Sequence, residues 1–74
     1  MNLEKLIRMT NQIAEFFAHE GAQRGAASVA DHLQKFWEPR MRAELVAAAA
    51  ADRAPGLTPL ALAAVRQLTP PPQH

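Results

Sequence analysis

The proline at position 39 places the tightest limit on how this chain folds. The segment before it, from Val29 to Trp37, has apolar residues at helical spacing. The ring of Pro39 disfavours α-helical backbone angles at Glu38, so a helix over this segment must end there. Because the first turn of a helix tolerates proline, a new helix is expected to begin at Pro39 itself. The sequence therefore predicts a sharp corner between two helices.

The N-terminal part of the chain has the period of an amphipathic helix. Apolar residues fall at positions 3, 6, 7, 13, 14 and 17, with Asn2 available as N-cap and Gly21 as a stop, which predicts a helix over residues 3–19. Met9 and Phe16 lie outside this stripe and form a second apolar strip. Two interpretations stay open: the helix is covered on both sides, or the strip docks onto another chain.

Two further signals mark the starts of later helices. Ser28 and Asp31 resemble a capping box, so we expect the second helix to begin near Ser28, after a break over residues 21–25. Thr58 followed by Pro59 is a capping residue before a proline, which predicts a short fourth helix. In the second helix, the apolar side is expected to include Phe36 as well as Trp37.

These signals together predict the fold class. No β-type alternation is present, so we expect an all-α protein, a small bundle of three to four short helices with a proline-rich C-terminal tail. Residues 1–69 are predicted to form a single helical domain and residues 70–74 a flexible tail. With 74 residues and no cysteine, the chain has a thin core that neither disulfides nor thiolate-bound zinc reinforce. Helix packing and association with a partner remain as sources of stability.

Charge and hydropathy exclude several classes of partner. The net charge is +1 with acidic and basic residues interleaved, so nucleic acid and anionic lipid are not strongly attracted. No segment approaches the roughly 20 apolar residues that span a bilayer. The N-terminus also lacks the apolar run of a secretory signal. We therefore expect a cytoplasmic protein that contacts neither nucleic acid nor a membrane.

No set of residues in the sequence supports catalysis or metal binding. His19, His32 and His74 are not spaced as a metal-binding pair on one helix face. His32 is expected to be a structural histidine at the edge of the second helix. A glycine-rich phosphate loop, a nucleophile with its base, and a pair of catalytic carboxylates are all missing. The chain is therefore predicted not to be catalytic by itself, with no catalytic, cofactor-binding or metal-binding residues.

The corner at Pro39 collects residue types that are common in binding hot spots. Trp37 precedes the proline, and Arg40, Met41 and Arg42 follow it. One interpretation is a surface that binds a partner protein. A second is that Phe36 and Trp37 anchor the core while the arginines cap helices or pair locally. A third is a nucleic-acid patch, which the neighbouring acidic residues oppose.

Three blocks of sequence together carry a family resemblance. They are residues 5–13 with Phe16 and Phe17, residues 30–33 with 36–42, and residues 57–60 with Ala64, Val65 and Leu68. The string Trp-Glu-Pro-Arg-Met-Arg over residues 37–42 is the most specific part. With these blocks the chain resembles the small delta subunit of the soluble, molybdenum-containing, NAD-dependent formate dehydrogenases. Glu38 stands where the family more often has aspartate, and Thr10 where alanine is common.

The resemblance implies a non-catalytic accessory subunit of a complex that oxidises formate to CO₂ and reduces NAD⁺. In such complexes the large alpha subunit holds molybdopterin guanine dinucleotide and iron-sulfur clusters, and other subunits carry FMN, further clusters and the NAD site. This chain is expected to bind none of these cofactors, since it has no cysteine to hold a cluster. The implied partner is the large alpha subunit, which the chain binds to stabilise the complex or to assist its maturation.

We combine the second apolar strip of the first helix and the corner in one hypothesis, that they form a single docking surface for the large subunit. Its predicted partner-binding residues are Arg8, Met9, Gln12, Phe16, Trp37, Arg40, Met41 and Arg42. The alternative function is a free-standing small helical regulator or nucleic-acid-binding module. That function needs a basic face, which the near-neutral charge disfavours.

Overall fold

The computed structural model describes residues 2–68. This part of the chain contains four α-helices and one short 3₁₀ turn. The elements in chain order are α1 (Leu3–Phe17), η1 (Ala18–Glu20), α2 (Ala22–Phe36), α3 (Pro39–Ala50) and α4 (Pro59–Gln67). No strand occurs in this range, so the prediction of a small all-α bundle is confirmed. The tail predicted for residues 70–74 lies outside the described residues.

Three helices begin where their capping residues predict. The Oδ1 atom of Asn2 accepts a hydrogen bond of 2.8 Å from the backbone N–H of Lys5 at the start of α1. The Oγ1 atom of Thr58 accepts one of 3.3 Å from Ala61 at the start of α4. Glu38 has extended backbone angles directly before α3, as expected for a residue that precedes proline. Caps and prolines thus set these boundaries locally.

The predicted start of α2 near Ser28 is wrong, because the helix already begins at Ala22. Gly21, with a φ of 91°, makes the sharp turn that separates α2 from η1. Ser28 is inside the helix, and its hydroxyl donates a hydrogen bond of 2.6 Å to the Oε1 atom of Glu20. This serine therefore ties α2 to η1, and it does not cap a helix.

Gly25 suggested a break in the sequence, but it lies within α2 at a position of close packing. A Cβ atom added there would be 3.1 Å from the carbonyl oxygen of Phe17 and 3.3 Å from the Cδ1 atom of Leu60. The missing side chain lets the backbone of α2 approach the end of α1 and the start of α4. Glycine at this site is a packing residue.

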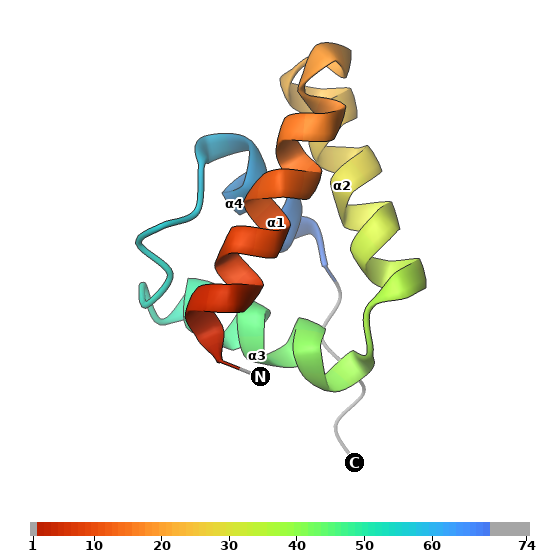
Figure 1. Ribbon diagram of the computed structural model, residues 1–74. Coiled ribbons are helices and arrows are strands. Elements are labelled where there is room, and N and C mark those ends of the chain that lie inside the picture. Colours follow the sequence, from red (N-terminus) through yellow and green to blue (C-terminus); the bar gives the residue numbers. More distant parts are fainter. Residues whose placement is uncertain (1, 69–74) are drawn as a thin grey trace.

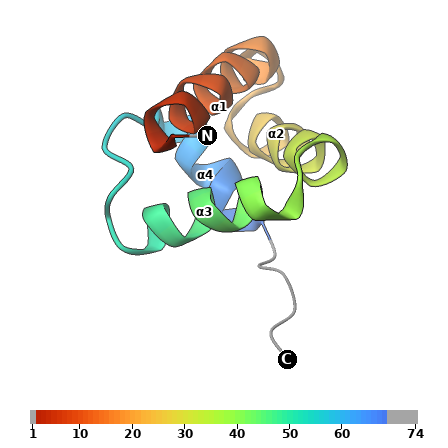
Figure 2. The same ribbon diagram turned by 60° about the horizontal axis from the view of Figure 1, so that its bottom comes forward.

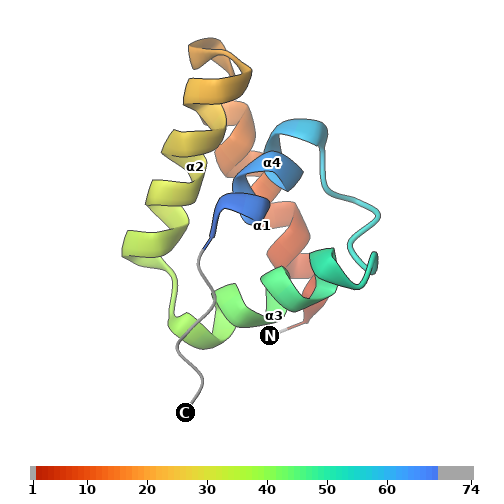
Figure 3. The same cartoon turned by 180° about the vertical axis from the view of Figure 1, so that it is seen from behind.

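The helices surround one hydrophobic cluster. In Figure 1, α1 and α2 lie side by side and are joined at the top by η1, while α3 crosses below them. Figure 2 brings α3 to the front, and Figure 3, seen from behind, shows α4 in front of α1 and next to α2. The most extensive packing between two helices is that of α2 against α4. The bundle measures 37 × 22 × 18 Å along its principal axes.

The loop between α3 and α4 is fastened to α1 by one side chain. The amide nitrogen of Asn11 donates a hydrogen bond of 2.8 Å to the carbonyl of Gly56. Its amide oxygen accepts one of 3.0 Å from the backbone N–H of Thr58. Both ends of the amide thus satisfy backbone groups of the loop, which sets where α4 begins relative to α1.

The core is built from the inward sides of all four helices. Its buried apolar residues are Leu6, Ala14, Ala26, Val29, Ala30, Leu33, Trp37, Leu45, Ala48, Ala61, Ala64, Val65 and Leu68. The prediction that Phe36 also belongs to this set is wrong, since its side chain is 73 % exposed. Trp37, at the extended C-cap of α2, fills the core position at the end of the helix, and Phe36 packs on His32 at the surface.

Candidate protein-binding surface

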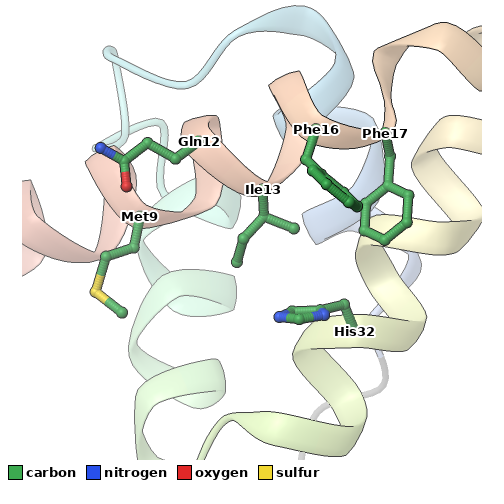
Figure 4. Close-up of a pocket in the computed structure, with 6 residues that line it drawn as sticks. All are labelled: Met9, Gln12, Ile13, Phe16, Phe17 and His32. Atoms are coloured by element: carbon green, nitrogen blue, oxygen red, sulfur yellow. The ribbon is translucent and has the colours of Figure 1, made fainter.

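An apolar groove runs between α1 and α2 on the face shown in Figure 4. Its volume is about 420 Å³. The residues that line it are Met9, Gln12, Ile13, Phe16, Phe17 and His32. In Figure 4, Ile13 lies between Met9 and the two phenylalanines, and His32 faces them from α2. We call this site the α1–α2 groove.

Aromatic rings connect the two helices across one end of the groove. The rings of Phe16 and Phe17 meet edge to face with their centroids 5.0 Å apart. Phe17 is 6.3 Å from His32, and His32 is 4.8 Å from Phe36, again between ring centroids. The two ends of this series, Phe16 and Phe36, are each 73 % exposed, and no other large hydrophobic residue in 2–68 is exposed. Such an apolar surface is typical of an interaction site.

The structure places three of the four predicted α1 residues in the groove. Met9, Gln12 and Phe16 line it, and Arg8 is exposed one turn before Gln12. Of the two interpretations left open for the strip, coverage on both sides does not hold for Phe16 within this chain. The proposal that the strip binds a partner stays a prediction, and its residues are available to one.

Trp37 has a different environment, because it is only 7 % exposed and belongs to the core cluster. The interpretation of Trp37 as a core anchor therefore describes its place in the chain. A buried indole ring contributes to folding through the apolar area that it removes from water. Trp37 is not displayed on the surface of the chain.

Arg42 acts locally at the end of α2. Its Nη1 atom donates hydrogen bonds to the carbonyl oxygens of Gln34 and Trp37, in the last turn of that helix. The last carbonyls of a helix have no partner within the helix and carry its negative end, so a guanidinium group there is favourable. The half-buried side chain of Arg42 thus links α3 back to α2 across the corner.

The remaining corner residues divide between surface and core. Arg40 is exposed, whereas Met41 is half-buried and packs against the core cluster. None of the four predicted corner residues lines the α1–α2 groove. The residues predicted to form a single docking surface therefore lie in two places, the α1–α2 groove and a corner that exposes mainly Arg40.

Sequence reasoning missed four residues around the groove: Ile13, Phe17, His32 and Phe36. The first two were assigned to the core stripe of α1, and they form the floor of the groove where α2 leaves that stripe uncovered. A signal for the other two was present, since His32 and Phe36 are four residues apart and flanked by charged residues. Asp31 and Lys35 form an ion pair of 3.1 Å beside them.

The side chains that line the groove are mostly apolar or aromatic. In the part of the chain that the structure describes, no group of three His, Cys, Asp or Glu residues is placed to hold a metal ion. Iron-sulfur clusters are held mainly by cysteine thiolates, and the sequence contains no cysteine, so the donor set does not fit such a cluster. No helix in residues 2–68 is long and apolar enough to cross a membrane.

The sequence matches a known family model over most of its length. The family model described as NADH-dependent formate dehydrogenase delta subunit FdsD matches residues 5–65. This range includes the residues of the α1–α2 groove and the whole corner. No curated protein and no solved structure matches the chain significantly.

Proposed function

We propose that this chain, which belongs to the family of NADH-dependent formate dehydrogenase delta subunits, binds the large alpha subunit of the formate dehydrogenase complex. Membership of the family confirms the resemblance found in the three sequence blocks. It makes the chain an accessory subunit of an NAD-dependent formate dehydrogenase, whose other subunits are its protein partners. The family match over residues 5–65 is the observation that carries the proposal.

The proposed role is to stabilise the complex or to assist its maturation. The exposed Phe16, which lines the apolar groove, and the exposed Phe36, which packs on His32 of the groove, support this role, because contact with a partner would remove both rings from water. The core of this chain is small, so association adds stability that the chain alone lacks. Arg40 at the corner offers a second, charged contact.

Formate chemistry belongs, in this proposal, to the other subunits. The molybdopterin guanine dinucleotide, the iron-sulfur clusters, FMN and NAD are held there, and this chain contributes no ligand to them. The sequence contains no cysteine that could hold an iron-sulfur cluster, which supports this division for the clusters. A cytoplasmic location of the assembled complex is part of the same proposal.

Expression of the complex with and without this chain separates the proposed roles. Three quantities are measured together: recovery of the other subunits, their molybdenum content, and formate-dependent NAD⁺ reduction. Poor subunit recovery without the chain indicates stabilisation, and full recovery with low molybdenum indicates maturation. Normal values of all three would contradict both roles.

A variant at the corner tests binding without disturbing the fold. Replacing Trp37 together with Arg40 is unsuitable, since loss of the buried Trp37 is expected to unfold the chain by itself. Arg40→Glu changes an exposed residue only and is expected to lower the recovery of this chain with the large subunit. Arg53→Glu, an exposed charge reversal in the α3–α4 loop, is the matched control.

A further inference from the structure

We infer, resting on the proposed function, that the α1–α2 groove receives a single amphipathic helix from another subunit of the complex, with carboxylates beside Lys5 and Arg8. The site extends beyond the strip predicted from α1, because the ring series places Phe36 of α2 on its rim. It is thus lined by both helices, with exposed Phe16 against Phe17 on α1 and exposed Phe36 against His32 on α2.

The shape of the groove selects a helix as its occupant. Met9 and Phe16 are seven residues apart on α1, which spans about 10 Å at the rise of an α-helix. Two turns of a partner helix match this length and present a ridge of apolar side chains spaced three and four residues apart. Helix-in-groove recognition of this kind needs no backbone contacts across the interface.

Other kinds of peptide fit this groove less well. Both walls of the groove are helices, whose backbone groups are bonded within the helix, so there is no strand edge to which an extended peptide adds. An extended or polyproline segment also needs donors for its own carbonyl groups. Only two polar side chains, Gln12 and His32, line the groove. A helix satisfies its own backbone and brings only side chains to the site.

Two basic residues near the groove indicate that the partner helix carries acidic side chains. Lys5 and Arg8 lie four residues before Met9 and Gln12, and both are exposed. Among residues 2–68 the ion pair of Lys35 with Asp31 is the only one, so no carboxylate in that range pairs with Lys5 or Arg8. Aspartate or glutamate on the partner helix is complementary to these two cations and sets its direction in the groove.

The same charges disfavour a second copy of this chain as the occupant. When two copies pack groove to groove about a two-fold axis across α1, Lys5 and Arg8 of each copy face the Phe16 end of the other groove, and no carboxylate lines that groove. Cations that meet no carboxylate across an interface oppose binding. The groove is therefore assigned to a different subunit.

Thiol labelling in the assembled complex tests whether the groove is covered. The chain has no cysteine, so Phe36→Cys gives it a single thiol, and Ala47→Cys on the exposed side of α3 is the matched control. We expect maleimide to label the Phe36→Cys chain at least tenfold more slowly than the Ala47→Cys chain within the complex. Equal labelling rates in chains that co-purify fully would overturn the inference.

Crosslinking identifies what covers the groove. A thiol-directed crosslinker attached through Phe36→Cys in the complex is expected to join this chain to a segment of another subunit, and mass spectrometry identifies the peptide. A helical segment with aspartate or glutamate near its apolar residues supports the inference. A crosslink to a second copy of this chain, or to a segment that is not helical, overturns it.

Co-expression distinguishes failure of this inference from failure of the proposed function. Phe16→Glu places a charge in the groove, and Ala47→Glu places the same charge on the exposed surface of α3. We expect at least a tenfold lower recovery of the Phe16→Glu chain with the other subunits and unchanged recovery of Ala47→Glu. If the unmodified chain itself is not recovered with them, the proposed function fails. If the unmodified chain and Phe16→Glu are recovered equally, only the groove assignment fails.

Discussion

Two consecutive aromatic residues, Phe36 and Trp37, have opposite environments in this protein. Phe36 is 73 % exposed at the rim of the α1–α2 groove, and Trp37 is 7 % exposed in the core at the corner. Successive residues of a helix point about 100° apart, so neighbours of similar chemistry readily serve different purposes. The corner, although rich in hot-spot residue types, therefore mainly holds the fold together, whereas the groove is available for binding.

Arg42 and Arg40 repeat this contrast with charged side chains. Arg42 donates hydrogen bonds to two carbonyls at the end of α2, and Arg40 is exposed. Residue types that are enriched at interfaces are therefore used inside the chain as well as at its surface.

The largest effect is expected for Trp37→Ala. Removing a buried aromatic side chain costs about 3–5 kcal/mol, which is comparable with all that the core of so small a domain provides, roughly 3–5 kcal/mol. The variant is therefore expected to be unfolded at 25 °C, as measured by far-UV circular dichroism. Trp37→Phe, which keeps most of the apolar volume, is expected to stay folded. A well-folded Trp37→Ala chain would remove the distinction between corner and groove.

A smaller loss is expected for Arg42→Ala. The hydrogen bonds to Gln34 and Trp37 disappear, and two carbonyls at the end of α2 lose their donor. We expect the free energy of unfolding to fall by about 1–2 kcal/mol, measured by urea denaturation. Arg40→Ala is the control, and its expected change is within about 0.5 kcal/mol. Equal losses in the two variants would show that Arg42 does not cap α2.

Gly25→Ala tests the close approach of α2 to α1, on which the shape of the groove depends. Helix propensity alone favours alanine by about 1 kcal/mol. The added Cβ atom would lie 3.1 Å from the carbonyl oxygen of Phe17, however, and the overpacking costs about 1–3 kcal/mol. A net loss of about 1 kcal/mol is expected in urea denaturation, since the second cost exceeds the first gain. Gln23→Ala on the exposed side of α2 is the control, and a net gain in Gly25→Ala would contradict the packing role.

The smallest change in stability is expected for Phe16→Ala and Phe36→Ala. Both side chains are largely exposed, so the free energy of unfolding of the purified chain is expected to change by no more than about 0.5 kcal/mol. Recovery of either variant with the other subunits, measured by co-purification, is nevertheless expected to fall. A loss of 2 kcal/mol or more, on the scale of core truncations, would place these residues with Trp37 as part of the fold.

Local signals were sufficient for three of the four helix starts. Asn2, Pro39 and Thr58 act through their own backbone angles and hydrogen bonds, so their effects are readable from a few adjacent residues. The start of α2 was missed because Gly25 has the appearance of a helix breaker. In the folded protein, the missing side chain of Gly25 leaves space for Leu60, which is distant in sequence. A local sequence pattern does not reveal this contact.

The candidate site was predicted only in part, for a related reason. Met9, Gln12 and Phe16 were found because they lie off the main apolar stripe of one helix. His32 and Phe36 were not found, since their place beside that strip depends on how α2 packs along α1. A groove between two helices belongs to neither helix alone, and a single periodic pattern does not describe it.

Local backbone preferences were enough to predict that the protein is all-α and that the chain turns at Pro39. Particular strings of residues were enough to predict the family to which it belongs. Burial of the residues at the edge of each apolar stripe depends on how the helices pack against one another. Helical periodicity fixes the angle between Phe36 and Trp37, but only the positions of the neighbouring helices determine which of the two lies in the core. Adjacent residues at the end of α2 therefore differ in environment, with Trp37 in the core and Phe36 on the surface where we propose that a partner binds.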